Sequence, residues 1–379
     1  MRIAINTRFL LKNKLEGIGW FTYEVIKRFV KKHPEHEFIF LFDRPYDSSF
    51  IFADNVKSIV VSPQARHPIL WYWWFEISVP KILKKERVDC FISTDGFLSS
   101  KLDIPQLLVI HDLALEHYPE NVSWMVNKYY ELYSKKYALK AGRIITVSEF
   151  SKQDIHKLYG IDLSKIDTVY NGANELYIPL NDNDKEEARQ KYSEGQPYFI
   201  YVGAVHPRKN VISLFKAFEF FKKKTGKSHK LLIVGRMAWK NEDLKSYYSQ
   251  MKHKSDVIFT GTRQANELSK LIGSAEAMIY LSYFEGFGIP VLESIYCQVP
   301  VIISNRTSLP EVAGEGGIII EPFDIEAAAQ SMDKIITDKE NTKLLIEKGK
   351  VQKAKFSWEK SADRFDHSFK QFCIDNKLS

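Results

Sequence analysis

The chain of 379 residues is 45% hydrophobic and 27% charged, a globular composition that excludes wholesale disorder. This length is too great for one ordinary core, so two domains of similar size are expected. The net charge of +7 is spread evenly along the chain, which suits an anionic ligand or a negatively charged membrane surface and speaks against a nucleic-acid partner.

Short apolar strands alternate with longer helical patterns from end to end, as in βαβ units with parallel sheets. Strands are expected near residues 2–7, 38–42, 58–61, 90–93, 107–111, 144–147 and 168–170, with helices between them, notably 18–30 and 124–140. The pattern restarts with strands near 198–205, 231–234, 257–259, 278–281, 301–303 and 318–320. The polar stretch 179–187 lacks periodicity and is the expected linker. The sequence therefore predicts two doubly wound α/β domains facing a cleft, with ligands beyond the carboxyl ends of the strands.

A glycine-rich segment, residues 16–20, joins the first strand to the first helix. Gly17 and Gly19 permit close approach of the backbone to a ligand. Thr22 occupies the place where a dinucleotide-binding fingerprint needs a third glycine, so hydride transfer is disfavoured. We expect a phosphate-facing loop, with an ordinary helix start as the alternative.

Polar residues follow several strands of the first half. His111 and Asp112 follow a buried strand and are candidate substrate contacts, with a structural histidine as the alternative. Ser148 and Asn171 also follow strands and are expected to line the same cleft. The aromatic run 71–75 is expected to be a buried helix face, with a membrane-facing or acceptor-binding patch as the alternative.

A basic turn follows the first strand of the second half. Arg208 and Lys209 precede Asn210, a good N-cap for the next helix. Cations at a helix N-terminus oppose the helix dipole, a placement that makes sense if they share an anion. Arginine grips phosphate oxygens with two donors and lysine adds a point charge. The alternative is a solvated basic turn.

Two glutamates flank a glycine loop and a helix start in residues 283–293. Because Pro290 suits the first helical position, Glu293 is expected in the first turn, and Glu285 lies in the loop. Both carboxylates are expected beside the free amides of Val291 and Leu292, a seat for an anion. Carboxylates accept hydrogen bonds from hydroxyls, so the segment predicts a nucleotide-sugar site. The alternative is a helix with two solvated glutamates.

Little in the sequence indicates a metal or a disulfide. Asp182 and Asp184 form an Asp-x-Asp pattern, but they lie in the polar linker, where a solvated hinge is expected. The three cysteines are expected to be reduced packing residues, since they are odd in number and far apart. The first residues enter a strand directly, without a signal-peptide core. These features predict a cytoplasmic protein and leave open a position at the inner face of a membrane.

Taken together, these motifs resemble those of the retaining glycosyltransferases of the GT-B fold, most of all the "group 1" family of bacterial cell-surface polysaccharide enzymes. The resemblance runs over nearly the whole chain, and it implies an N-terminal acceptor-side domain of residues 1–178 and a nucleotide-sugar-binding domain of residues 179–355. The terminal segment 356–379 is then expected to pack back onto the first domain.

The resemblance also implies roles for individual residues. Arg208 and Lys209 clamp the diphosphate, Glu285 holds the hydroxyls of the donor sugar, Glu293 holds those of the ribose, and His111 approaches the reacting carbon. Further donor contacts are expected from Gly17, Gly19, Thr262, Arg263, Gly286, Phe287, Gly288, Val291 and Leu292, and acceptor-side contacts from Asp112, Ser148 and Asn171.

The implied activity is transfer of a hexose from a nucleotide-diphosphate sugar to a glycan or lipid-linked acceptor. Residues 111–120 look like the same run in mannosyltransferases that use GDP-mannose, and a UDP-sugar stays open. Retention by front-side attack is expected, without metal or other cofactor, because Arg208 and Lys209 can stabilise the leaving diphosphate. The alternatives are a sugar-nucleotide epimerase of the same fold and a non-catalytic nucleotide-sugar-binding protein.

Overall fold

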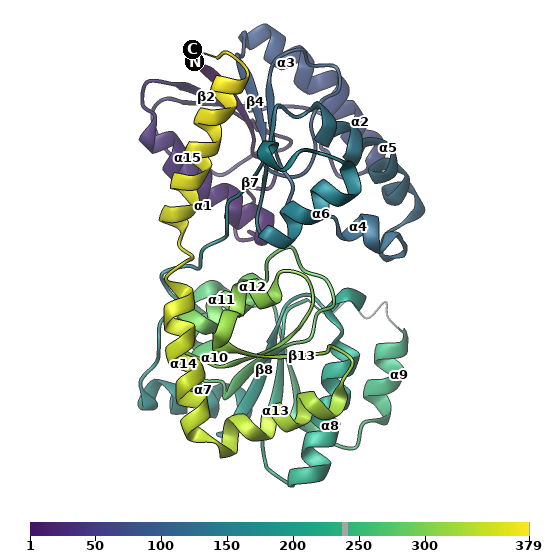
Figure 1. Cartoon of the computed structure of the whole chain (residues 1–379), viewed down its shortest axis with the longest axis vertical. Helices are drawn as coiled ribbons and strands as arrows, with labels where there is room; N and C mark the ends of the chain where they lie inside the picture. The colour runs from purple at the N-terminus through teal and green to yellow at the C-terminus, as the bar shows by residue number, and fades with distance from the viewer. Residues whose placement is uncertain (237–241, 379) are drawn as a thin grey trace. The chain divides into compact units, whose positions relative to one another are not determined.

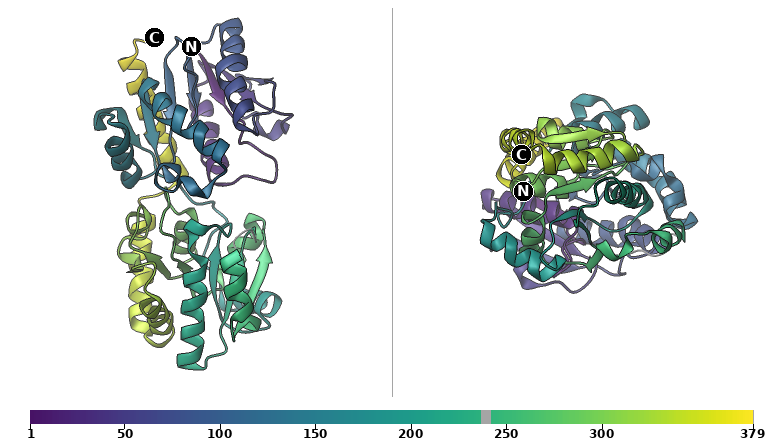
Figure 2. Two further views of the ribbon diagram at one scale, coloured as in Figure 1. Left: turned by 90° about the vertical axis from the view of Figure 1, so that its right-hand side faces the viewer. Right: turned by 90° about the horizontal axis from the view of Figure 1, so that it is seen from below.

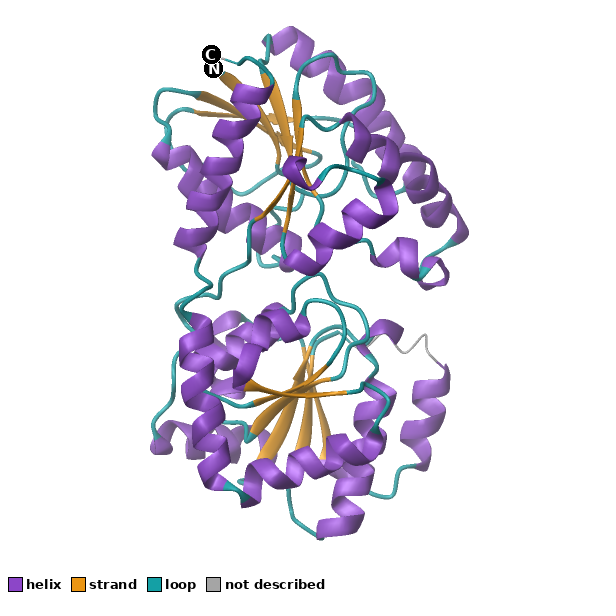
Figure 3. Ribbon diagram, in the orientation of Figure 1, coloured by secondary structure: helices purple, strands orange, loops and turns teal. Residues whose placement is uncertain are grey.

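The computed structural model describes residues 1–236 and 242–378, which form two units (Figure 1). Unit 1 consists of Met1–Asn171 together with Trp358–Ser379, and unit 2 of Gly172–Ser357. Each unit has a central parallel sheet with helices around it (Figure 3). The prediction of two doubly wound α/β domains is therefore confirmed.

The sheet of unit 1 has seven strands in the order β3-β2-β1-β4-β5-β6-β7. All its strand pairs are parallel, and the central strands are apolar runs buried on both faces, as parallel sheets require. The strands are β1 Arg2–Asn6, β2 Glu37–Phe42, β3 Val56–Val60, β4 Cys90–Ser93, β5 Gln106–Val109, β6 Arg143–Thr146 and β7 Ile166–Thr168.

The helices of unit 1 include the last helix of the chain. Phe29 of α1 packs edge-on against Phe365 and Phe369 of α15, with ring centroids 5.1 and 5.0 Å apart. Asp366 of α15 also lies 2.7 Å from Nε2 of His33. The terminal helix thus belongs to the core of unit 1. The α-helices are α1 Gly17–Lys32, α2 Pro68–Trp73, α3 Val79–Glu86, α4 Ala114–His117, α5 Trp124–Lys140, α6 Glu149–Tyr159 and α15 Trp358–Asp375.

The sheet of unit 2 has six parallel strands in the order β10-β9-β8-β11-β12-β13. Helices cover both of its faces (Figure 2). The strands are β8 Tyr198–Val202, β9 Lys230–Val234, β10 Val257–Gly261, β11 Ala277–Tyr280, β12 Val301–Ser304 and β13 Gly317–Ile320. The α-helices are α7 Asp182–Ser193, α8 Val211–Thr225, α9 Glu242–Gln250, α10 Ala265–Gly273, α11 Ile289–Tyr296, α12 Leu309–Ala313, α13 Ile325–Thr337 and α14 Lys339–Lys353.

In each sheet the chain builds outward in one direction and then returns to the other side of its first strand. The reversal falls between β1 and β4 in unit 1 and between β8 and β11 in unit 2. At such a switch point the connections from the two neighbouring strands continue to opposite faces of the sheet, which makes this the usual place for a ligand. Two candidate regions follow from the topology alone.

The linker predicted at residues 179–187 is wrong, because helix α7 begins at Asp182. Asn181 caps this helix, its side chain accepting a hydrogen bond from the amide of Asp184 at 2.9 Å. Asp182 and Asp184 lie in the first turn, where negative charge is favourable. Only Ala188 and Ser193 of the helix are buried, so no apolar period marked it in the sequence.

The cysteines of the chain are free. Cys90 and Cys297 are buried, and Cys373 is partly exposed. Among the described residues, no helix combines the length and the apolar character needed to cross a membrane.

Candidate functional site

Two loops meet at the switch point of unit 2, one after β8 and one after β11. The amide of Tyr283 donates to the carbonyl of Arg208 at 3.0 Å. The Arg208 guanidinium donates from Nη1 to the carbonyl of Phe284 at 2.8 Å and to Oε2 of Glu285 at 2.9 Å. Lys209 pairs with the other oxygen of the same carboxylate. The structure thus brings together the basic turn and the first glutamate that the sequence singled out separately.

Glu285 is a buried carboxylate held between two cations. Its side chain is only 7% exposed. Burial alone would raise the pKa of Glu285, but the charges of Lys209 and Arg208 outweigh it and lower the pKa to about 2. The carboxylate is ionised at neutral pH, and the three side chains together carry one net positive charge.

Tyr280 of β11 holds the Lys209 side chain in place. The Nζ of Lys209 donates to the Tyr280 hydroxyl at 2.6 Å and lies 5.0 Å from the centre of that ring. Tyr280 stacks on Tyr201 of β8, with centroids 5.8 Å apart. Burial, together with the charge of Glu285, raises the pKa of Tyr280 well above its usual value. Tyr280 therefore stays neutral and supports the ammonium group without removing its charge.

Asn210 has the expected position but a different role. It precedes α8, yet its side chain makes no cap hydrogen bond. Instead Nδ2 donates to the carbonyls of Leu281 and Pro322 at 3.2 and 2.8 Å. The backbone of Asn210 has φ +53°, which lets the chain turn from the basic turn Pro207–Lys209 into α8. The predicted N-cap hydrogen bond is therefore wrong, and the residue joins the loops that follow β8, β11 and β13.

The anion seat predicted at Val291 and Leu292 is also wrong for these two amides. Both donate to the carbonyl of Gly288, at 3.0 and 3.4 Å. Helix α11 begins at Ile289, one residue before the proline, so Glu293 falls in its second turn. Gly288 has φ +99°, and a Cβ there would lie 2.6 Å from Leu309. Only glycine fits at this helix start.

The loop between β11 and α11 is braced by residues that the sequence analysis missed. Ser308 donates to the carbonyls of Glu285 and Phe287 at 2.9 and 3.0 Å. Thr307 accepts from the amide of Glu285 at 3.1 Å. Both follow β12, the strand beside β11, so the rule that ligands lie beyond strand ends would have pointed to them. The brace fixes the direction of the Glu285 side chain.

Glu293 differs from Glu285 in its electrostatics. Burial raises the pKa of Glu293 to about 7, while a hydrogen bond from the Tyr177 hydroxyl acts in the opposite direction. Tyr177 is itself buried. The first glutamate is thus a permanent anion, whereas the second changes its charge near neutral pH.

Replacing Glu293 with glutamine is expected to alter the pH dependence of unfolding. The pKa of Glu293 is 4.5 in the unfolded chain and about 7 in the folded protein, so at pH values between these two the protein takes up a proton when it folds. The contribution of Glu293 to the free energy of unfolding therefore falls as the pH rises through this window. Glutamine does not titrate, so the free energy of unfolding of the variant should increase relative to that of the wild type between pH 5 and pH 8. Urea unfolding at both pH values measures the change.

The matched control for Glu293→Gln is Glu321→Gln. Glu321 is an exposed partner of Arg306, and their hydrogen bond lowers the pKa of Glu321 below its usual value. Its titration lies below the tested window, so this variant should differ from the wild type equally at both pH values. An equal difference for Glu293→Gln would contradict the assignment.

Thr262 and Arg263 lie in the loop after β10, the edge strand of the sheet. Both are exposed. Arg263 reaches Glu267 of α10 at 3.3 Å and lies 6.0 Å from the ring centre of Tyr192. The structure thus gives Arg263 partners outside the Arg208–Glu285 cluster, and its contact with a base stays a prediction.

In unit 1 the predicted glycine loop is wrong, because Gly17 begins α1 and Gly19 lies in its first turn. A Cβ on Gly19 would lie 2.9 Å from the carbonyl oxygen of Phe9 and 3.1 Å from Leu15. The glycine is required by the approach of the chain's own preceding loop. A contact of these residues with a ligand stays a prediction.

His111 and Ser148 come together at the ends of β5 and β6. The His111 ring donates from Nε2 to the carbonyl of Thr94 at 2.9 Å, and burial lowers the pKa of His111. Ser151 donates to the carbonyl of His111 at 3.2 Å. Ser148 is fully buried and caps α6 by accepting from the amide of Ser151. His111 is therefore a neutral imidazole, and Ser148 has a structural role.

Asp112 and Asn171, the other two acceptor-side candidates, differ in the hydrogen bonding of their side-chain oxygens. Asp112 accepts from the amide of Ala114 at 3.0 Å and so stabilises the start of α4. Asn171 is buried, and its Oδ1 has no hydrogen-bond partner among the described residues. An unpaired buried oxygen is costly, so Asn171 retains capacity for a donor.

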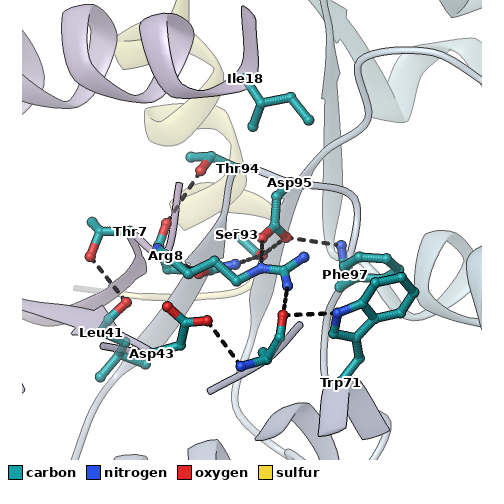
Figure 4. Close-up of polar contacts among 12 residues, drawn as sticks. Thr7, Arg8, Ile18, Leu41, Asp43, Trp71, Ser93, Thr94, Asp95 and Phe97 are labelled. Atoms are coloured by element: carbon teal, nitrogen blue, oxygen red, sulfur yellow. Dashed lines mark hydrogen bonds and ion pairs between the residues drawn. The ribbon is translucent and has the colours of Figure 1, made fainter. Parts of the chain in front are cut away.

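A second polar cluster, which the sequence analysis missed, lies at the switch point of unit 1 (Figure 4). Arg8 follows β1 and pairs with Asp95, which follows β4; their side chains are 5% and 1% exposed. Arg8 also donates to the carbonyl of Ala65 at 3.1 Å, and the Trp71 indole donates to the same oxygen at 2.9 Å. The pair therefore ties together the loops that follow three strands. Polar residues directly after two neighbouring strands were the available signal.

One group of side chains in the described part of the chain has the spacing of metal ligands. His33, Glu35 and His36 place one donor atom each within 4.8 Å of the others. The group follows α1 and lies at the contact with α15. Metal-independent chemistry stays a prediction.

Comparisons with known proteins give a consistent result. The model "Glycosyl transferases group 1" matches residues 182–352, and "Glycosyltransferase Family 4" matches residues 15–175. The chain is 30% identical over 290 residues to O-antigen chain mannosyltransferase RfbU of Salmonella typhimurium, covering 76% of each chain. It is 29% identical over 266 residues to O-antigen chain mannosyltransferase B of Escherichia coli, covering 69% of this chain and 68% of that one.

Among solved structures, Anabaena Alr3699/HepE in complex with UDP and glucose matches with a TM-score of 0.75 at 15% identity. The match covers 97% of this chain and 99% of that one, and it shows the fold. Two parallel-sheet α/β units in this arrangement of elements are the GT-B fold. From the sequence match to RfbU and the two family models, the chain belongs to the group 1 glycosyltransferases.

Proposed function

We propose that this glycosyltransferase moves a hexose from a nucleotide-diphosphate sugar to a glycan or lipid-linked acceptor in surface polysaccharide synthesis. The observation that carries the proposal is the cluster of Arg208, Lys209 and Glu285 at the switch point of unit 2. Such a cluster offers positive charge to a diphosphate and, beside it, a permanently ionised acceptor for hydroxyl groups.

The three side chains have complementary tasks in this proposal. In the described structure Glu285 neutralises one of its two cationic neighbours. The negative charge of a diphosphate would offset the remaining positive charge and draw Arg208 and Lys209 toward the phosphate oxygens. The two cations would then stabilise the leaving group as its negative charge grows. Glu285 would then accept hydrogen bonds from sugar hydroxyls, and the sugar would keep the carboxylate apart from the phosphates.

A retaining, front-side course is part of the proposal. A carboxylate with a pKa of about 2 and two ion pairs is a poor nucleophile, which supports Glu285 as a hydroxyl acceptor and not as the attacking group. The departing phosphate oxygen would take the acceptor's proton. Glu293 is proposed to hold ribose hydroxyls, His111 to contact the transferred sugar as a neutral imidazole, and no metal is invoked.

The names of the relatives support the choice of sugar and pathway. Both relatives described above are called O-antigen chain mannosyltransferases, which supports mannose and a polysaccharide product. The Anabaena protein was solved with UDP and glucose, so a UDP-sugar stays an alternative donor. Membership in a transferase family favours transfer over the epimerase and the non-catalytic binder. A lipid-linked acceptor would place the enzyme at the inner face of a membrane.

A thermal-shift series with GDP, UDP and their common sugars tests the donor. A ligand at 100 times its Kd stabilises the folded state by about 2.7 kcal/mol, so the true donor should raise the Tm by several degrees. GDP-mannose is the expected winner. The stereochemical course is read by NMR from the one-bond coupling between C1 and H1 of the transferred sugar, because the proton–proton coupling at C1 is small in both anomers of mannose. A flat series, or an inverted anomer, would contradict the corresponding part of the proposal.

A further inference from the structure

Unit 1 carries an unusual concentration of exposed apolar side chains. Trp124 is 73% exposed and Trp73 is 51% exposed. Six further large hydrophobic residues with exposed side chains lie on the same two helical segments. The full set, called here the aromatic face, is Ile69, Tyr72, Trp73, Ile77, Trp124, Met125, Leu132 and Leu139. An exposed patch of this kind indicates an interaction site.

The aromatic face is carried by two helical segments that pack against each other. The first is the helical run 68–86, in which α2 continues through the π-helical turn Trp74–Ser78 into α3. The second is α5, which lies beside α2 in unit 1 (Figure 1). Tyr72 packs on Tyr133 with ring centroids 6.0 Å apart, and Trp71 packs on Tyr129 at 5.3 Å. These contacts join the two segments beneath the exposed side chains.

The aromatic run 71–75 thus divides between the core and the surface. Trp74 and Phe75 are fully buried, as expected for a core helix face, whereas Tyr72 and Trp73 are exposed. The Trp74 indole donates to the carbonyl of Val61 at 2.9 Å. The buried side of the helical run anchors it to the core of unit 1, and the other side faces the solvent.

Exposed lysines lie among the apolar residues. On α5, Lys128, Lys135, Lys136 and Lys140 are exposed, against the single acid Glu131. The run 68–86 adds Lys81, Lys84 and Lys85, while its two acids are removed from the surface charge: Glu76 is buried and Glu86 pairs with Lys57. The face therefore combines tryptophan, leucine and isoleucine with a net positive charge.

We propose that the aromatic face docks unit 1 onto a bilayer that contains anionic lipid. Tryptophan favours the boundary between headgroups and acyl chains, and lysine beside it is attracted by anionic headgroups. Lysine stems can lie along apolar matter while their ammonium groups stay hydrated. A second protein copy fits this surface less well, because the cores of protein interfaces are depleted in lysine.

This inference deepens the proposed membrane location by naming the surface responsible, and it does not depend on the donor. The Arg208–Glu285 cluster belongs to unit 2, whereas every residue of the aromatic face belongs to unit 1. Binding to vesicles is therefore measured without nucleotide sugar. A failure of membrane binding leaves the thermal-shift result untouched, and the reverse also holds.

The test is sedimentation of the full chain with vesicles of phosphatidylcholine alone or with about one-third phosphatidylglycerol. The wild type is expected to bind the anionic vesicles and to release them in high salt. The variant Trp73→Ser with Trp124→Ser should bind on the order of tenfold more weakly. A triple variant should bind anionic vesicles more weakly than the wild type, by about fivefold or more for each lysine replaced. It combines Lys128→Glu, Lys135→Glu and Lys136→Glu.

The matched control is Leu344→Ser with Val351→Ser, which removes two equally exposed apolar residues from α14 of unit 2. Its vesicle binding should equal that of the wild type. The proposal is overturned if the wild type prefers neutral vesicles, if its binding ignores salt, or if the control loses as much as the tryptophan variant. It is also overturned if the tryptophan variant keeps its vesicle binding and instead dissociates a dimer in size-exclusion chromatography.

Discussion

Replacing Arg208 with alanine is expected to lower kcat by about 10²-fold and to leave unit 2 folded. The guanidinium supplies one of the two positive charges that face the proposed diphosphate. Removal of Arg208 leaves Lys209 to neutralise Glu285, so no buried charge is stranded. Steady-state turnover with the donor found by thermal shift measures the effect, and the Tm of each variant checks the fold.

Two further variants sharpen the test of Arg208. Arg208→Lys keeps the charge but loses the planar fork, so its kcat should fall between those of the wild type and of Arg208→Ala. Arg306→Ala removes an exposed arginine of the same unit, whose pair with Glu321 is solvated, and should leave kcat unchanged. Unchanged turnover in Arg208→Ala would remove this residue from the mechanism.

Replacing Asp95 with asparagine is expected to destabilise unit 1 by about 3–5 kcal/mol. The substitution leaves the Arg8 guanidinium buried without its carboxylate, among the rings of Phe9, Phe75 and Phe97 at 4.8 to 5.3 Å. The aromatic faces attract a cation, but only weakly compared with the lost ion pair. Hydrogen exchange of the β1 and β4 amides, measured in urea, reports the loss within unit 1.

The control for Asp95→Asn is Glu37→Gln, which breaks the exposed pair between Arg2 and Glu37 in the same sheet. Its cost should stay within about 1 kcal/mol. The double variant Arg8→Met with Asp95→Leu removes both buried charges and should recover part of the lost stability. An Asp95→Asn cost no larger than that of Glu37→Gln would show that the buried pair does not hold the loops together.

The polar clusters at the two switch points differ in net charge. In unit 1 the charges cancel as one pair, Arg8 with Asp95, and that pair is almost wholly buried. In unit 2 two cations share one carboxylate, and a positive charge is left over. A balanced, buried pair suits a structural role, whereas excess charge at a loop junction suits an anionic ligand.

Several features of this protein followed from the sequence by itself. Short apolar strands that alternate with helical patterns predicted the parallel α/β fold, because strands buried on both faces are apolar over consecutive residues. The same reasoning located Arg208, Lys209 and Glu285 after their strands. It was wrong about α7, about the first turn of α1, and about the amides of Val291 and Leu292, where capping and local packing decided the outcome.

Only the tertiary structure decided how these residues work. The order of the strands brings the Arg208 turn to Glu285, 77 positions away, and brings Arg8 to Asp95, 87 positions away. The charges of Lys209 and Arg208 then lower the pKa of Glu285 to about 2, whereas burial raises the pKa of Glu293 to about 7. Charge pairing and desolvation depend on neighbours in space, and local sequence patterns do not specify those neighbours.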